Sequence, residues 1–171
     1  MPTASSLIRD ERPDDTDEIA SLVERAFANH PHSQQTEHII VRELRAAGQL
    51  ILPAVAVLDG KIIGYATFSP VRLKPAHEGW YGLGPVAVDP AHQGVGFGSM
   101  LITSALERLK GGGARGCVVL GEPRFYGRFG FVHEPNLILE GVPPEYFLGQ
   151  AFIGAVPAAR VSYHAAFSAS V

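Results

Sequence analysis

The chain has 171 residues, of which 46% are hydrophobic and 18% are charged, so it carries enough apolar side chains for the core of one ordinary domain. Its net charge of −3 argues against a nucleic-acid-binding protein that relies on neutralising phosphates, and no apolar run is long enough to span a bilayer. The single cysteine excludes an internal disulfide, and the charged N-terminal stretch is unlike a signal peptide, so we expect a cytoplasmic protein.

The first part of the chain is predicted to be helical after a short apolar piece at Leu7–Ile8. Apolar residues then recur at the spacing of one helix face, namely Ile19, Leu22, Val23, Ala26 and Phe27. Asp15 or Thr16 can cap this helix. A second helix is predicted from Ser33 to Ala47, where Gly48 ends it.

Strand signals dominate the next segment. Two β-rich runs within residues 54–73 are joined by Asp59–Gly60, a dipeptide that favours a tight type I′ hairpin turn. A third run, "GWYGLGPVAV" at residues 79–88, is interrupted by Gly84–Pro85. Because proline has no N–H to donate to a ladder, we expect a bulge or a locally unpaired edge at that point.

A glycine-rich loop, "HQGVGFG" at residues 92–98, follows this third run and precedes a helix predicted from Gly98 to Leu109. Glycine lets backbone N–H groups approach a ligand, and the N-terminus of a helix carries partial positive charge. The combination predicts a phosphate site, with a ligand-free glycine turn as the alternative. Ser99 stands where a dinucleotide fingerprint needs its third glycine, and the lysine of a Walker A loop is missing.

The remaining elements complete a mixed sheet. "CVVL" at residues 117–120 is typical of a strand that is buried on both faces, and further short runs follow up to "RVSYHAAF". The order is helices, an antiparallel hairpin, a strand–helix–strand crossover and more strands, which favours an α/β fold with helices on both faces of one mixed sheet. No repeat, low-complexity tract or linker interrupts residues 1–171, so we expect a single domain.

Several segments resemble one family. The spacing Gln93-x-x-Gly96-x-Gly98 resembles motif A of the GCN5-related N-acetyltransferases (GNAT), and "RFYGRFGF" at residues 124–131 looks like motif B. The opening strand and helix also match, and the C-terminal "VPPEYF" and "VSYHAAF" look like the YhbS-like branch. The resemblance implies a GNAT fold whose central sheet is splayed around the strand that holds the cofactor. It also implies acetyl transfer from acetyl-CoA to a primary amine within a ternary complex, with a non-catalytic acetyl-CoA sensor as the alternative.

The resemblance places the cofactor on backbone groups. Those of the glycine loop would hold the pyrophosphate of coenzyme A, and the residues concerned are Gln93, Gly94, Val95, Gly96, Phe97, Gly98 and Ser99. Val86, Ala87 and Val88 match the strand that pairs with the pantetheine arm. An N–H near Val86 would donate to the oxyanion of the tetrahedral intermediate.

Tyr126 is the candidate general acid, because a phenol is protonated at neutral pH and the motif B match places it beside the thiol. The sequence does not identify the base, for which Glu37, Glu78 and a chain of water molecules are the candidates. The asparagine that many relatives carry is replaced here by Val119, and the helix of that region is expected to shorten to about one turn. We expect no metal, no nucleic acid and no membrane partner. The acceptor is expected to be a small-molecule or peptide amine, and homodimerisation is left open.

Overall fold

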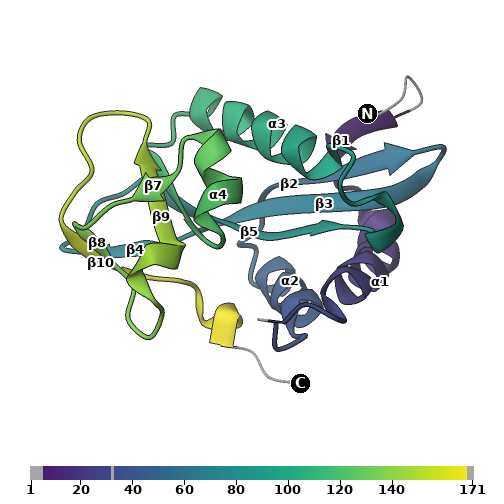
Figure 1. The fold of residues 1–171 in the computed structure, drawn as a ribbon, viewed down its shortest axis with the longest axis horizontal. Helices are drawn as coiled ribbons and strands as arrows, with labels where there is room; N and C mark the ends of the chain where they lie inside the picture. Colours follow the sequence, from purple (N-terminus) through teal and green to yellow (C-terminus); the bar gives the residue numbers. More distant parts are fainter. Residues whose placement is uncertain (1–5, 32, 169–171) are drawn as a thin grey trace.

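The computed structural model describes residues 6–31 and 33–168, and Figure 1 shows their arrangement. These residues form a seven-stranded sheet and a three-stranded sheet. In its spatial order, the large sheet contains β1 (Ser6–Asp10), β2 (Ile51–Leu58), β3 (Lys61–Pro70), β5 (Trp80–Val88), β6 (Gly116–Leu120), β9 (Phe147–Ala151) and β7 (Val132–His133). The pair β5–β6 is parallel and the other neighbours are antiparallel, which confirms the predicted mixed α/β sheet.

Helices cover both faces of this sheet (Figure 1). Helix α3 (Phe97–Gly111) lies on one face, where Leu101 and Ile102 are fully buried. Helices α1 (Thr16–Phe27) and α2 (Glu37–Ala46) lie on the other face, where Leu22 and Leu44 are fully buried. None of the helices in the described residues is long and apolar enough to cross a membrane.

The second sheet was not expected from the sequence. It contains β4 (Arg72–Lys74), β10 (Ala159–Ser162) and β8 (Leu137–Ile138), in that order, and it packs on Trp80 of β5 and Val118 of β6. The last alternating run of the sequence stays a strand only as far as Ser162. The chain then passes to a short 3₁₀ helix, η5 (Ala165–Ser168), which packs against α2.

The local predictions have mixed outcomes. The hairpin turn is confirmed, because Asp59 (φ 50°) and Gly60 (φ 79°) are both left-handed. The start of the second helix is wrong: α2 begins at Glu37 rather than Ser33, because Gln35 is left-handed (φ 62°) and the Ser33 hydroxyl donates instead to the carboxylate of Glu37.

Helix α1 begins where it was expected, but Asp15 serves a different purpose. Its carboxylate makes no capping bond to α1. It accepts hydrogen bonds from the Arg9 guanidinium and from the backbone N–H of Arg12. The Arg9 hydrogen bond outweighs partial burial and lowers the pKa of Asp15, so this ion pair ties β1 to the start of α1.

Candidate active site

The parallel strands β5 and β6 pair over a short stretch and then separate. Trp80 pairs with Gly116, and Gly82 with Val118, and this is the last pair. Beyond it, the rest of β6 pairs with β9, whereas residues 83–88 of β5 pair with β3. One edge of β5 is therefore left open along residues 83–88, and Gly82 marks the vertex of this splay.

A β-bulge lies just after the vertex. Phe68 pairs with Leu83 and Ala66 with Val86, so two residues of β5, Gly84 and Pro85, lie opposite one residue of β3. The predicted irregularity at Gly84–Pro85 is confirmed, and the peptide bond between them is cis. The bulge shifts the alternation of the strand by one residue.

This shift decides which backbone groups face the open edge. The Asp89 N–H donates to the Ile63 carbonyl at 2.8 Å, so the alternation of an antiparallel ladder directs the backbone groups of Ala87 toward β3. The N–H and C=O groups of Val86 and Val88 then point to the open edge. Before the bulge, the Val71 N–H donates to the Trp80 carbonyl at 3.1 Å, so the backbone groups of Trp80 face β3. By the same alternation, the backbone groups of Leu83 point to the open edge.

The glycine loop lies at the end of this open edge. Gly94 (φ 80°) and Gly96 (φ 101°) are left-handed, a conformation that glycine adopts without strain. Gly96 is the N-cap residue of α3, and no described side chain caps that helix. Because the first N–H groups of a helix have no partner within it, those at the start of α3 are available to an anion.

Side chains around the loop hold it in place rather than enter it. The Asp89 carboxylate accepts from the backbone N–H of Ala91 and from Arg25 of α1, each at 3.0 Å. Burial alone raises the pKa of Asp89, but these two hydrogen bonds and the Arg25 charge outweigh it and lower the pKa overall. The Gln93 amide donates to the Val88 carbonyl at 3.0 Å and so fastens the loop to β5.

Tyr126 ends α4 (Pro123–Tyr126), which is the one-turn helix that was expected. A Cβ atom on Gly121 would lie 2.4 Å from Cε2 of Tyr126, so the ring packs directly over that glycine. Its edge contacts are with Phe125 and Phe131, at centroid distances of 5.0 and 6.1 Å. Burial raises the pKa of Tyr126 to about 12, so its phenol stays protonated at neutral pH.

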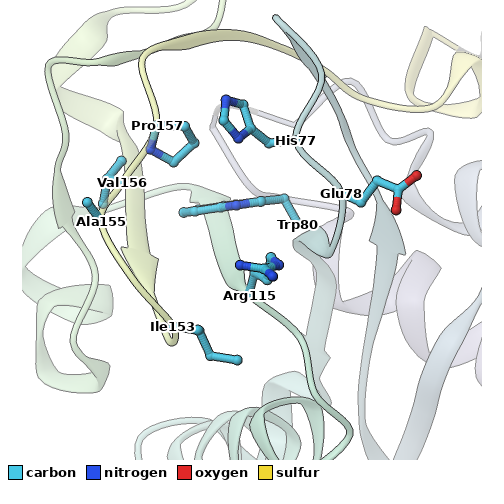
Figure 2. Close-up of a pocket in the computed structure, with 8 residues that line it drawn as sticks. All are labelled: His77, Glu78, Trp80, Arg115, Ile153, Ala155, Val156 and Pro157. Atoms are coloured by element: carbon cyan, nitrogen blue, oxygen red, sulfur yellow. The ribbon is translucent and has the colours of Figure 1, made fainter.

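The two candidate bases lie in different places. Glu78 precedes β5 and borders a cavity of 340 Å³ beside Trp80 and Arg115, at the end of the strand opposite the open edge. Figure 2 shows its carboxylate directed away from Trp80. Glu37 is the first residue of α2, and the Ser33 hydroxyl donates to its carboxylate at 2.7 Å. Glu37 therefore lies on a helix that covers the sheet face opposite α3, whereas Glu78 is kept away from the splay.

Cys117 is not placed to be a nucleophile. It is fully buried, and desolvation raises the pKa of its thiol, which keeps it protonated. Within the described residues, no group of histidine, cysteine and carboxylate side chains is arranged to hold a metal ion.

The sequence did not single out Tyr163, which the structure places at the vertex. A Cβ atom on Gly82 would lie 2.7 Å from Cε2 of Tyr163, so the ring fills the space beside the glycine. A glycine inside a β-rich run is a signal for such close approach, but it does not reveal which residue approaches.

Comparisons with known proteins agree with this architecture. The model of the Acetyltransferase (GNAT) family matches residues 15–131. The uncharacterized N-acetyltransferase YhbS of Escherichia coli K12 is 38% identical over 126 residues, which cover 73% of this chain and 72% of YhbS. A crystal structure of a GNAT family acetyltransferase from Brucella melitensis in complex with acetyl-CoA is 47% identical, with a TM-score of 0.85 over 95% of this chain and 97% of that one. The structure of E. coli YhbS in complex with CoA is 32% identical, with a TM-score of 0.88 over 99% and 95% of the two chains.

Proposed function

Because the chain belongs to the GNAT acetyltransferase family, we propose that it transfers an acetyl group from acetyl-CoA to a primary amine by direct attack within a ternary complex. The observation that carries the proposal is the continuity of the uncapped N-terminus of α3 with the open edge of β5. The similar proteins from B. melitensis and E. coli bind acetyl-CoA and CoA, respectively. We also propose that residues 1–171 act as one domain.

The pyrophosphate of the cofactor binds to the backbone N–H groups of residues 93–99, where the dipole of α3 adds partial positive charge. The hydroxyl of Ser99, in the first turn of α3, adds a donor. The pantetheine arm then runs along β5 like an added strand, bonded to the backbone groups of Val86 and to the N–H of Val88, with Ala87 between them. This direction brings the thioester toward the bulge and the vertex at Gly82.

The reaction forms a bond between the amine nitrogen and the thioester carbonyl carbon, which gives a tetrahedral intermediate with a negatively charged oxygen. The Val86 N–H, which faces the open edge, donates to that oxygen. The C–S bond then breaks. The Tyr126 hydroxyl donates a hydrogen bond to the departing thiolate and then transfers its proton to it. Glu37, Glu78 or a water chain accepts the proton that the amine loses. Glu37 is the better placed of the two carboxylates, because α2 packs on the cofactor strand through Val41 and Ala87.

The second candidate is a module that binds acetyl-CoA without turning it over. It is favoured by the absence of a carboxylate in β5, which leaves the reaction without a base on the cofactor strand. An acceptor amine separates the two functions, because an acetyltransferase requires one and a sensor does not.

A thiol-release assay tests the proposal. The purified chain is mixed with acetyl-CoA and with single amines from a panel of amino acids, amino-acid amides, polyamines, aminoglycosides and peptides. Amine-dependent release of CoA, with the acetylated amine identified by mass spectrometry, is the expected result. Binding of CoA by calorimetry with no release above the rate without amine would favour the sensor.

A further inference from the structure

The segment that follows β10 packs against the vertex of the splay. In Figure 1 it leaves the small sheet and ends beside α2. The ring of Tyr163 packs on Gly82, with Cε2 and Cζ at 2.7 and 3.2 Å from the position of an added Cβ. Its other ring neighbour is Phe167 of η5, at a centroid distance of 5.0 Å, and η5 packs on α2 through Ala166. The segment therefore places Tyr163 at the vertex, and the packing of η5 on α2 holds it there.

Two buried hydroxyl groups near this vertex lack partners among the described residues. Tyr163 Oη and Ser69 Oγ are both buried, and neither has a hydrogen-bond partner among the described residues. Ser69 of β3 pairs directly with Gly82, so its side chain lies on the face of the sheet on which Tyr163 packs. Buried polar groups are nearly always hydrogen-bonded in native proteins, so these two hydroxyls, one on β3 and one beside its partner Gly82, are candidate contacts for a bound group.

The surroundings of the two hydroxyls limit what that group can be. The atoms nearest to an added Cβ on Gly82 belong to Tyr163 and Val71, and Ser69 is the residue paired with Gly82; none of these three carries a charge. Burial, with the neighbouring Cys117 thiol and Tyr126 phenol, raises the pKa of Tyr163, so its hydroxyl remains a donor at neutral pH. Such a pair suits a neutral group that both accepts and donates, and it cannot neutralise a second ammonium group.

We propose that Tyr163 Oη and Ser69 Oγ bind the acceptor through a neutral polar group next to its reacting amine, such as the carboxamide of an amino-acid amide or the first peptide group of a peptide. The carboxamide oxygen accepts from Tyr163, and its N–H donates to Ser69. This inference rests on the proposed function. It agrees with a cofactor strand that lacks a carboxylate, because an α-amine has a pKa of about 8 against about 10.4 for an alkylamine and is far more often neutral at pH 7.5.

A matched pair of amines tests the inference. L-Leucinamide and 3-methylbutylamine differ by one carboxamide, and kcat/KM is measured for each at saturating acetyl-CoA. The wild type should prefer leucinamide. Tyr163→Phe should lower kcat/KM for leucinamide about tenfold and leave that for 3-methylbutylamine within about twofold, as expected for one lost hydrogen bond. Ser69→Ala should produce the same selective loss. The Kd for CoA, measured by calorimetry, should stay unchanged, and Tm should not fall, because neither hydroxyl has a hydrogen-bond partner among the residues that the structure describes.

Tyr65→Phe is the matched control. Tyr65 is a fully buried tyrosine of β3 whose hydroxyl donates to Glu11 at 3.1 Å. Its replacement should lower Tm and leave the ratio of the two amines unchanged. An equal loss for both amines in Tyr163→Phe and Ser69→Ala, or no loss for either, would overturn the inference, and so would a wild type that acetylates other amines but prefers 3-methylbutylamine to leucinamide. A wild type that binds CoA and acetylates no amine of the panel would overturn the proposed function itself, and the acceptor role with it.

Discussion

A Cβ atom on Gly98 would lie 3.5 Å from Cγ2 of Val88, an ordinary van der Waals distance. Gly98 is in the first turn of α3, and Val88 ends β5 with its backbone groups directed to the open edge. A third residue, Phe125, would be 4.0 Å from the same atom. The protein alone therefore has room for a methyl group here, but that group would be added to the first turn of α3, where we place the pyrophosphate.

We expect Gly98→Ala to weaken CoA binding by about tenfold or more while the fold is kept or slightly stabilised. The methyl group blocks close approach of the pyrophosphate to the backbone, whereas alanine favours a helix over glycine by about 0.5–1 kcal/mol. Calorimetric titration with CoA and urea unfolding measure the two effects separately. Gly96 is less suitable, because its φ of 101° would strain any other residue.

Gly111→Ala is the control for this experiment. Gly111 is the last residue of the same helix, no atom lies within 4 Å of an added Cβ, and its φ is not left-handed. It should raise stability by a similar amount without changing the Kd for CoA. The loop assignment is wrong if the two variants bind CoA equally well.

Tyr126→Phe should lower kcat by about 10–100-fold and leave the KM for acetyl-CoA nearly unchanged. The ring keeps its packing over Gly121 and against Phe131, so only the donor to the departing thiolate is lost. Steady-state kinetics with acetyl-CoA and an active amine make the measurement. An unchanged kcat, at a rate shown to be limited by chemistry, would remove Tyr126 from the mechanism.

The same residue makes a prediction about pH and stability. The pKa of Tyr126 is about 12 in the folded protein, above the ordinary value near 10, so the unfolded chain loses this proton first. Stability should therefore fall as pH rises above about 10, and Tyr126 should contribute up to about 1.4 kcal/mol per pH unit to that slope. Urea unfolding at pH 9, 10 and 11 should give a shallower slope for Tyr126→Phe than for the wild type. Parallel slopes would show that the phenol is not desolvated.

Local signals in the sequence were sufficient for much of this site. Glycines in the loop and the Gly84–Pro85 interruption act through backbone conformation, which depends on a few adjacent residues. They correctly placed the loop before α3 and the bulge in β5. The predicted start of α2 was wrong because the hydrogen bond from the Ser33 hydroxyl to Glu37 and the left-handed conformation of Gln35 compete with helical propensity. The spacing of apolar residues reveals neither of them.

Pairings between distant segments could not be predicted. In the small sheet, β4 pairs with β10, although the two strands are far apart in the sequence. Neither strand has a residue pattern that predicts which strand it pairs with. The same holds for Tyr163, whose position depends on the path of the chain from β10 to α2. Gly82 shows where space is needed, but tertiary structure decides what fills it.

The choice of base can be tested with two glutamine variants. Glu37→Gln should lower kcat/KM for the acceptor by about 100-fold if the α2 carboxylate takes the amine proton, and Glu78→Gln should change it by less than about twofold, because Glu78 borders the cavity near Trp80. CoA affinity should be unchanged in both. Full activity in both variants would leave proton removal to water.

Trp80 and Gly116 pair at the start of the short parallel ladder between β5 and β6, and the indole packs closely on the glycine. A Cβ atom on Gly116 would lie 2.4 Å from Cη2 of the Trp80 indole, and Trp80 is only 4% exposed. We therefore expect Gly116→Ala to destabilise the protein by about 1–3 kcal/mol through overpacking.

Replacing Trp80 with a smaller side chain should restore part of the stability that Gly116→Ala loses. Trp80→Leu alone leaves a cavity and destabilises, but in the double variant the added methyl group occupies part of the vacated space. The two changes should therefore couple by more than about 0.5 kcal/mol in a double-mutant cycle measured by urea unfolding. Additive losses would mean that β6 moves away from the indole as a unit. In that case the separation of β5 from β6, and with it CoA affinity, should change in Gly116→Ala.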